Sequence, residues 1–566
     1  MKRLLVILLI FTLSAWCFAG EPKKENANYA IIGAHGSSVT KDGTRAAEYD
    51  EATTHAEGSL KFRWLKTDGD VKVRWEGEVE SHSDMRFKLI VNKGRWFKST
   101  TTYNKFLHRL GHDRLKNLEG RESVNPDINK PGGKFVTHVD YEPDLEYYTV
   151  YENFRQVFDF NPENGGVFKH VQAGFNALSR KGYHQINGLS HCDSCHIQSK
   201  GAETDEITYD FWVKADAKIG NTDVSYSATY SKFNNQAGKS YFYYDIPRHP
   251  IKGNLIEELG SRTLFGGQIL PADYNNDNEM FENKLSIESV ITPKDTIYAK
   301  LLYSTQKNKA LDLQLDTKAG SLRYTRKFSK DFRFDAYFSY YTLDNDDYYV
   351  DLPDWRAGRP GGGQPMSFLR QSAYNRDVSY FKLRGIYKLD QNQRLTFIYR
   401  YQQIDRDYLI VNYENNSTET TKNLFKIRYD ARFEGVKAFV QASYEDIDHP
   451  FEAYNGIYEP SFHNYQGTLW YYKRERTGEA TSLPNQDFKL NGSFTVDLNE
   501  NSSLNMYASY RDGENDELNT YKMDLKYKNA GLDYFVQLGE TTVLTLGYDY
   551  SNGSQTTLFA VPIMDG

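Results

Sequence analysis

Apolar and polar side chains alternate with a period of two over many stretches of this chain. Between residues 331 and 341 one set is Phe332, Phe334, Ala336, Phe338 and Tyr340, and the other is Arg333, Asp335, Tyr337, Ser339 and Tyr341. Residues 488–498 repeat the pattern, with Phe488, Leu490, Gly492, Phe494, Val496 and Leu498 set against Lys489, Asn491, Ser493, Thr495 and Asp497. Strict alternation predicts β-strands whose two faces meet different surroundings.

Other segments follow the same rule and are separated by short, turn-rich connections. Near the C-terminus Tyr521, Met523, Leu525 and Tyr527 alternate with Lys522, Asp524, Lys526 and Lys528. The segments run about ten residues, the length that a tilted strand needs to cross hydrocarbon. Connections such as residues 389–392 and 499–502 are short enough to favour antiparallel neighbours. We expect Arg333, Asp335 and Lys526 to lie on the wet, polar face of such a sheet.

The composition indicates which class of β-protein the strand pattern belongs to. The mean hydropathy is -0.70, yet the chain holds 44 Tyr and 33 Phe, too many aromatics for a solvated coil. A soluble β-protein would have a core of Val, Ile and Leu, whereas aromatics dominate the apolar face here. No long apolar run follows the N-terminal segment, which excludes helical spans. The sequence predicts an all-β protein, a large closed antiparallel transmembrane barrel of roughly 20–26 strands surrounded by outer-membrane lipid.

The N-terminus predicts export. Met1-Lys2-Arg3 is basic, residues 4–16 are apolar, and Cys17-Phe18-Ala19 offers a small-residue cleavage site. These are the parts of a cleaved signal peptide, here residues 1–19. An uncleaved anchor fits less well, because the apolar run is short for a membrane span. We therefore expect an integral protein of the outer membrane of a Gram-negative bacterium.

The alternation also suggests how the mature chain is divided. Residues 20–57 are expected to form an N-terminal periplasmic segment, and residues 58–106 the first barrel strands. Between residues 107 and 203 the alternation breaks up, which predicts an irregular insertion or long periplasmic loop. Residues 204–566 are expected to form the main transmembrane barrel.

The predicted insertion carries the most specific motif of the chain, His191-Cys192-Asp193-Ser194-Cys195-His196. It contains C-x-x-C-H, the attachment pattern of c-type haem. We predict one covalent haem c, with Cys192 and Cys195 as thioether positions and His196 as proximal ligand of the iron. A plain disulfide or redox dithiol is one alternative. Zinc is another, although it would need a fourth ligand.

The second axial ligand is less well defined by the sequence. His184 lies eight residues before Cys192, where a short loop could fold it over the iron. His170 and His138 compete with it, Met85 is a further candidate, and a partner protein could also supply the ligand. A histidine at any one such position is more often an ordinary surface residue.

Taken together, these segments resemble the MtrB/PioB family of outer-membrane barrels. The resemblance is carried by Arg45-Ala46-Ala47-Glu48-Tyr49, by Phe106-Leu107-His108-Arg109-Leu110 with Asp113, by residues 191–196 leading into Thr208-Tyr209-Asp210, and by strand–turn–strand runs such as Tyr380 to Arg406. Better-known members carry a CxxC close to the mature N-terminus, whereas the pair lies deep in this sequence. The C-terminus also lacks the terminal aromatic that is usual in outer-membrane barrels.

The resemblance implies a function in electron transfer. Members of the family form the sheath of porin–cytochrome conduits, so the expected partners are multihaem c-type cytochromes, periplasmic, extracellular or both. One haem cannot bridge a hydrocarbon layer of about 30 Å, which makes such a partner necessary. The alternative function is a diffusive porin or solute channel with a structural CxxC pair. A net charge of -7 argues against nucleic acid as a partner, and no nucleophile–base constellation points to an enzyme.

Overall fold

The computed structural model describes the chain in segments. They are residues 28–36, 48–49, 56–115, 136–162, 166–190, 195–243, 269–272, 274–350, 356–357, 364–365, 368–370, 372, 375–406, 419–448, 483–516 and 523–556. Of these, the side chains of residues 35, 36, 56, 136–138, 189, 190, 195, 196, 350, 356, 357, 364, 365 and 368–370 lie outside the description. Within these segments, no helix has both the length and the apolar character needed to cross a bilayer.

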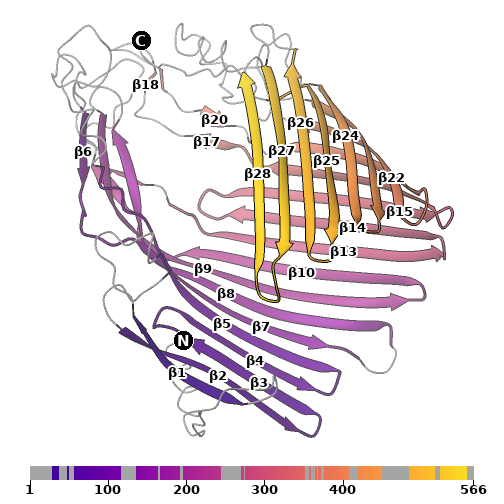
Figure 1. The fold of residues 1–566 in the computed structure, drawn as a ribbon. Coiled ribbons are helices and arrows are strands. Elements are labelled where there is room, and N and C mark those ends of the chain that lie inside the picture. Colours follow the sequence, from indigo (N-terminus) through magenta and orange to yellow (C-terminus); the bar gives the residue numbers. More distant parts are fainter. Residues whose placement is uncertain are drawn as a thin grey trace. The chain divides into compact units, whose positions relative to one another are not determined.

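The chain forms two compact units. The first comprises residues 1–217, 227–281 and 308–310, and the second comprises residues 218–226, 282–307 and 311–566. The regular elements are strands (Figure 1). Because β10 (Thr222–Asn235), β13 (Asn278–Thr292) and β14 (Asp295–Asn308) contribute residues to both units, each unit is described by itself.

The first unit is built on a run of antiparallel strands. They are β1 (Tyr29–Gly36), β2 (Ala56–Asp68), β3 (Val71–Val79), β4 (Met85–Lys93), β5 (Phe97–Arg109), β7 (Tyr148–Phe160), β8 (Phe168–Ser190) and β9 (Cys195–Ile219), each paired with the next. The short strand β6 (Val136–Asp140) pairs in parallel with the start of β9. Strands β11 (Tyr241–Tyr243) and β12 (Ile269–Pro271) pair with each other.

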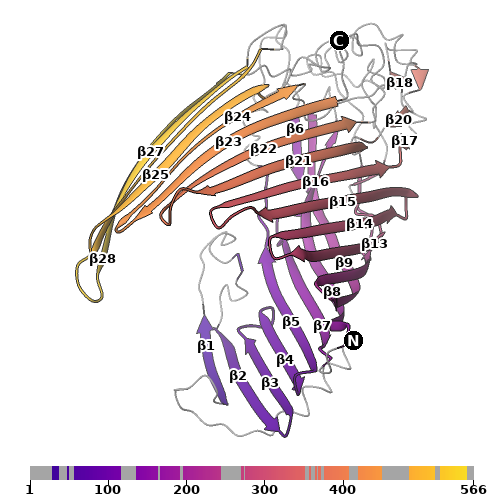
Figure 2. The same cartoon turned by 90° about the vertical axis from the view of Figure 1, so that its right-hand side faces the viewer.

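The second unit is a longer antiparallel ladder (Figure 2). In pairing order it contains β15 (Leu313–Lys327), β16 (Phe332–Asn345), β21 (Arg376–Lys388), β22 (Gln393–Arg406), β23 (Glu419–Phe433), β24 (Val436–Asp448), β25 (Gln486–Asn499), β26 (Ser502–Asn515), β27 (Met523–Gln537) and β28 (Val543–Thr556). Small pairs add β17 (Tyr348–Val350) to β20 (Phe368–Arg370), and β18 (Arg356–Ala357) to β19 (Gln364–Pro365).

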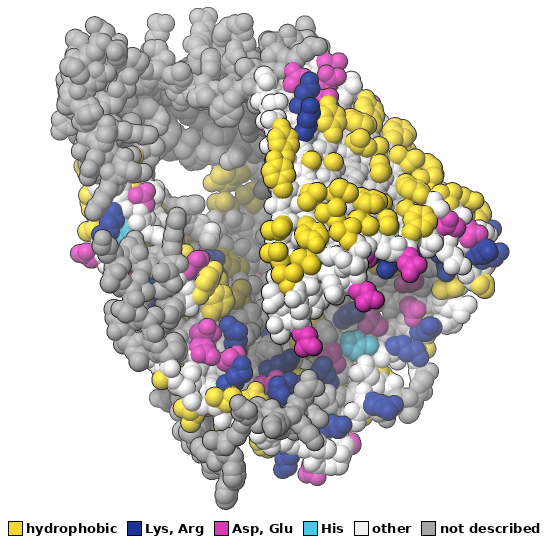
Figure 3. Space-filling model, viewed as in Figure 1, with side chains coloured by type: hydrophobic (Ala, Val, Ile, Leu, Met, Phe, Trp, Pro, Cys, Tyr) yellow, Lys and Arg dark blue, Asp and Glu magenta, His cyan; other side chains and the backbone are white. Residues whose placement is uncertain are grey.

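The register separates the second unit into an apolar and a polar face, as the alternation predicts. One row of cross-strand neighbours is Phe334, Gly385, Phe397, Ile427, Ala442 and Leu490. The next row, on the opposite face, is Asp335, Arg384, Ile398, Lys426, Ser443, Lys489 and Arg511. Figure 3 shows hydrophobic side chains gathered over the C-terminal strands of this unit. The all-β, antiparallel architecture is confirmed, while closure into a barrel and the strand number stay predictions.

The prediction for Lys526 is wrong. Lys526 pairs with Asp512, which pairs with Phe488, so Lys526 belongs to the same face as the apolar rows. Tyr527 instead shares the polar face, opposite Arg511. The reason is that the apolar side chains of this face do not continue to Asp512 on β26 and Lys526 on β27. Charged side chains therefore replace aromatic ones on the same face, and alternation alone assigns them to the wrong side.

The irregular insertion predicted for residues 107–203 is also wrong, because β6, β7, β8 and the first residues of β9 lie within it. Their alternation is blurred, since Glu152 and Gln156 share a face with Phe154 and Phe158 while Tyr151 lies on the other face. The segment expected to be periplasmic, residues 20–57, contains β1, which pairs with β2. The boundaries of the predicted functional segments themselves stay predictions.

The apolar face of the second unit can be tested with two neighbouring substitutions on β25. Leu490, 41% exposed, shares the apolar face, and Asn491 shares the polar face. If the apolar face contacts hydrocarbon, Leu490→Arg lowers the free energy of unfolding by about 2–4 kcal/mol. The matched Asn491→Arg change costs far less, because its charge stays in water. Urea unfolding in lipid vesicles, followed by tryptophan fluorescence, measures both, and equal losses would contradict the assignment of faces.

Candidate functional site

The cysteine motif lies where β8 turns into β9. Strand β8 ends at Ser190, β9 begins at Cys195, and Ser190 pairs with His196. Cys192 lies outside the described residues, and Cys195 and His196 are described through their backbone alone. On the other side of β9, β6 runs parallel to it, with Thr137 opposite His196. The motif is therefore placed at a reversal of the chain, with β6 beside its second half.

Strand pairing distinguishes the candidates for the second axial ligand. His138 lies opposite Ile197, one position from the partner of His196. His184 lies opposite Ala202, six positions along β8 from Ser190, or about 20 Å at the usual rise of a strand. The Nδ1 of His184 is within 2.8 Å of the Thr204 hydroxyl. The structure brings the backbone of His138 to the motif and does not bring His184 there.

The remaining candidates are further away along the sheet. His170 lies near the opposite end of β8, where its two ring nitrogens are 3.1 Å from Asp216 and 3.0 Å from Asp159. Met85 begins β4, which pairs with β3 and β5. Across the part of the chain that the structure describes, no group of three His, Cys, Asp or Glu side chains is arranged to hold a metal ion.

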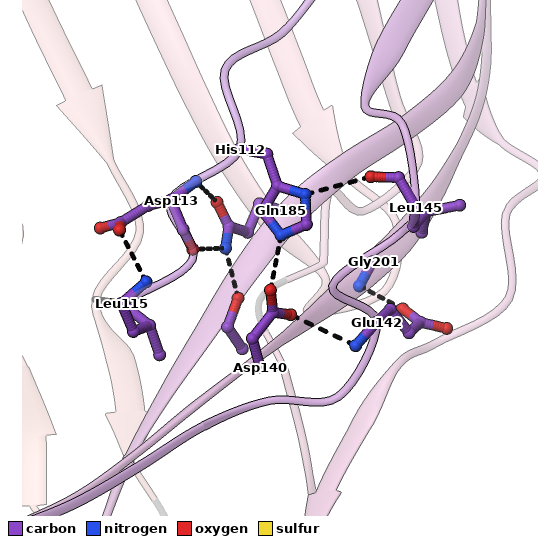
Figure 4. A network of polar contacts seen from close by, with 9 residues as sticks. His112, Asp113, Leu115, Asp140, Glu142, Leu145, Gln185 and Gly201 are labelled. Carbon is purple, nitrogen blue, oxygen red and sulfur yellow. Dashed lines mark hydrogen bonds and ion pairs between the residues drawn. The ribbon is translucent and has the colours of Figure 1, made fainter. Parts of the chain in front are cut away.

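A buried histidine–aspartate pair lies beside the far end of β6 (Figure 4). The Nε2 of His112 is 2.7 Å from Oδ2 of Asp140, and its Nδ1 is 3.1 Å from the carbonyl oxygen of Leu145. The two side chains are only 10% and 6% exposed. Both ring nitrogens therefore lie within hydrogen-bond distance of an oxygen acceptor. This contact ties the end of β6 to the segment that follows β5.

Gln185 connects the same segment to the hairpin that carries the cysteine motif. Its side-chain oxygen accepts the backbone N–H of Asp113 at 2.9 Å, and its amide donates to the carbonyl of Asp113 at 2.6 Å. The amide also donates to the Ser199 hydroxyl at 2.5 Å. Ser199 is fully buried and lies opposite Asp140 in the β6–β9 pairing. The position of β6 along β9 is therefore fixed by side chains as well as by backbone pairing.

Tyr147 completes this cluster through contacts of its aromatic ring. It is 2% exposed, and its ring contacts His112 edge-on with ring centroids 4.6 Å apart. Among the described residues, its buried hydroxyl has no hydrogen-bond partner. Burial, followed by the nearby carboxylates of Asp140 and Glu142, raises the pKa of Tyr147 to about 12. The hydroxyl is thus held in its neutral form.

The sequence did not single out His112, Asp140 or Tyr147. They lie in a short strand or in connections, all without periodicity, and each is brought to the cluster by strands that the alternation did not reveal. One weak signal was present, since Asp113 was part of the segment that carried the family resemblance.

Comparison with known proteins places the chain near outer-membrane proteins. Residues 218–446 match the family model described as outer membrane beta-barrel porin, MtrB/PioB. No curated protein sequence matches the chain. The match supports the resemblance and an outer-membrane location. It begins after the cysteine motif, so it does not bear on the haem prediction.

Several solved structures match much of this chain at low sequence identity. The FrpB iron transporter from Neisseria meningitidis is 9% identical, with 88% of this chain and 80% of that chain covered and a TM-score of 0.42. A mutant of the ferric enterobactin receptor PfeA from Pseudomonas aeruginosa is 10% identical, with 92% and 74% covered and a TM-score of 0.49. The siderophore receptor PirA from Acinetobacter baumannii is 10% identical, with 87% and 73% covered and a TM-score of 0.46.

Removing the carboxylate of the His112–Asp140 pair should loosen β6. In Asp140→Asn the His112 ring loses its carboxylate partner in a buried setting, which costs about 1–3 kcal/mol of local stability. Hydrogen exchange measured on peptides covering residues 136–145 should become faster. Asp144→Asn, at an exposed position in the same segment, serves as the matched control and should leave exchange unchanged. Equal exchange in both variants would show that the pair does not hold β6.

The raised pKa of Tyr147 gives a pH dependence with a defined sign. Its folded pKa of about 12 lies above the unfolded value of about 10. The stability that the neutral phenol contributes is therefore present below pH 10 and lost as the pH rises towards 12. The difference in absorbance at 295 nm between the natural protein and Tyr147→Phe isolates this one phenol. We expect a midpoint near pH 12, and a midpoint near pH 10 would contradict the buried setting.

Proposed function

We propose that this protein is a closed transmembrane barrel of the bacterial outer membrane that surrounds a multihaem c-type cytochrome and takes part in electron transfer across that membrane. The observation that carries the proposal is the match of residues 218–446 to the MtrB/PioB porin model. The two-faced ladder of the second unit adds physical support, because one face is suited to lipid and the other to a polar interior.

Closure of the sheet follows from the membrane as solvent. A strand edge inside hydrocarbon would leave a row of backbone N–H and C=O groups without partners, at several kcal/mol for each group. A sheet that crosses a bilayer avoids this cost by pairing its first and last strands. We therefore expect the outer strands of the described ladders to be paired in the membrane.

The chain's own haem is proposed to be held by Cys192 and Cys195 as thioethers, with His196 as proximal ligand. The donor set of the motif supports this fit, since two thiols three positions apart can match the two vinyl groups of one porphyrin and the next residue is a histidine. When bound, the haem iron would supply one-electron oxidation and reduction. The protein would provide the attachment, the axial imidazole and a fixed position on the hairpin, which Gln185 and Ser199 help to hold.

The strand register changes which histidine we propose as the second axial ligand. A ligand has to contact the iron, and His184 lies about 20 Å along β8 from the pairing partner of His196. We retain His184 as the weaker proposal for this ligand and propose His138 as the stronger one. The comparison of His138→Ala with His184→Ala decides between them, because loss of a sixth ligand converts a low-spin haem spectrum to a high-spin one.

The haem is tested by the cysteines themselves. In the full chain exported to the bacterial envelope, we expect a haem-stained band and a Soret absorbance that disappear in Cys192→Ser combined with Cys195→Ser. Cys17→Ser, within the expected signal peptide, is the matched control and should keep both signals. Absence of a Soret band from the natural protein would contradict the haem assignment and leave the barrel standing.

The conduit is tested by its partner. Mild detergent extraction of outer membranes should recover a multihaem c-type cytochrome with this chain in a fixed ratio. The alternative function, a diffusive porin, draws support from the porin description of the matched family. Ion conductance by the isolated, cytochrome-free barrel in a planar bilayer, with no cytochrome recovered from native membranes, would favour the porin and contradict the conduit.

A further inference from the structure

The polar face of the second unit carries a concentration of positive charge. Six cationic side chains lie on β15, β21, β22 and β23, which are four of the five successive strands from β15 to β23. We call the following set the cationic patch: Arg323, Lys382, Arg384, Arg400, Lys426 and Arg428. The pairing register places all of them on the face opposite Phe334, Phe397 and Ile427.

The two acids within this region are already engaged. Asp335, 5% exposed, receives Arg384 at 2.6 Å, Arg333 at 3.0 Å and Arg323 at 3.2 Å. Asp430 receives Arg428 at 2.8 Å and Arg394 at 3.0 Å. Five guanidinium groups therefore share two carboxylates, and the region keeps a positive excess.

The remaining three cations face one another. Lys382 lies directly opposite Arg400 on the neighbouring strand, where Cβ atoms are about 5 Å apart. Lys426 lies opposite Ile398, two positions from Arg400 on β22. In the part of the chain that the structure describes, none of these three side chains forms an ion pair with an acid. Like charges placed opposite each other destabilise a sheet, so the arrangement is costly unless something anionic covers it.

The width of the cationic patch and its mixture of charged and apolar side chains indicate what kind of molecule would bind it. Five strands at about 4.8 Å spacing extend about 19 Å across the sheet, which is too wide for a single small anion. Ile398 and Leu424, the latter 7% exposed, lie on the same face between the cations. Charged groups around buried and half-buried apolar side chains are the composition of a protein interface.

We propose that the cationic patch is a docking surface for an acidic, carboxylate-rich protein surface. The proposal rests on the proposed function in that it names the chemistry by which the enclosed partner is recognised. Complementary charge would steer the partner into place and set its orientation, and would relieve the repulsion between Lys382 and Arg400.

The test uses the purified full chain in detergent, with poly-L-glutamate as the probe. The variant Lys382→Gln, Arg400→Gln, Lys426→Gln removes the unpaired cations. The control is Lys61→Gln, Lys181→Gln, Lys309→Gln, which removes the same charge at lysines that are ion-paired with Glu78, Asp205 and Glu279. We expect binding at low salt to weaken at least tenfold in the first variant and less than threefold in the control.

Two outcomes would overturn the proposal. An equal loss of poly-L-glutamate binding in both variants would show that binding depends on the net charge of the protein alone. Inorganic pyrophosphate that binds as tightly as poly-L-glutamate would indicate a small-anion site in place of an extended surface. Lys382→Arg with Lys426→Arg keeps the charge and should keep binding, which guards against a folding defect in the glutamine variant.

A second measurement uses the repulsion itself. Lys382→Glu replaces a like-charged pair with an opposite-charged one, so the melting temperature of the isolated protein should stay equal or rise while poly-L-glutamate binding falls. A fall in both would contradict the proposal. If the natural protein binds poly-L-glutamate but no cytochrome is recovered with it, the docking surface is supported and the conduit is contradicted. Failure of the docking surface and failure of the conduit can therefore be distinguished.

Discussion

The structure depends on the pairing of every strand with its neighbours while successive side chains point to opposite faces. Pairing satisfies the backbone, and the period of two assigns each residue to one of two environments. In the second unit this yields an apolar row from Phe334 to Leu490 next to a polar row from Asp335 to Arg511. A shift of one residue in any strand would exchange the rows, so the register is what the sequence has to specify most firmly.

The polar face is organised around a few carboxylates rather than an even balance of charge. Asp335 holds three arginines from β15, β16 and β21, which links neighbouring strands through one buried side chain. Arginine suits this role because its planar fork can bond one carboxylate while presenting other donors elsewhere. The same face then leaves Lys382, Arg400 and Lys426 without such a centre. The ion pairs of this region are thus concentrated at Asp335, next to cations that form no ion pair within the described residues.

The sequence predicted the strands where the two environments differ strongly. Residues 331–341 and 488–498 alternate strictly, and their strands and faces are confirmed by the register. It failed where the contrast weakens, as in β7, whose faces mix Phe154 with Gln156, and at Lys526, beyond the apolar band. The buried pair of His112 and Asp140 could not be predicted, because it joins a loop to a five-residue strand whose parallel pairing leaves no periodic signal. The motif at residues 191–196 was visible at once, since its chemistry depends on spacing alone.

The most direct test of the account measures which side chains meet lipid. Single cysteines at residues 488–495 of β25, introduced into the Cys192→Ser, Cys195→Ser background, can carry nitroxide labels in a reconstituted bilayer. The account predicts that collision with oxygen, which concentrates in lipid, peaks at Phe488, Leu490, Gly492 and Phe494. Collision with a water-soluble nickel chelate should peak at the positions between them. Accessibility without a period of two, or with both reagents favouring the same residues, would contradict the claim that this sheet separates lipid from a wet interior.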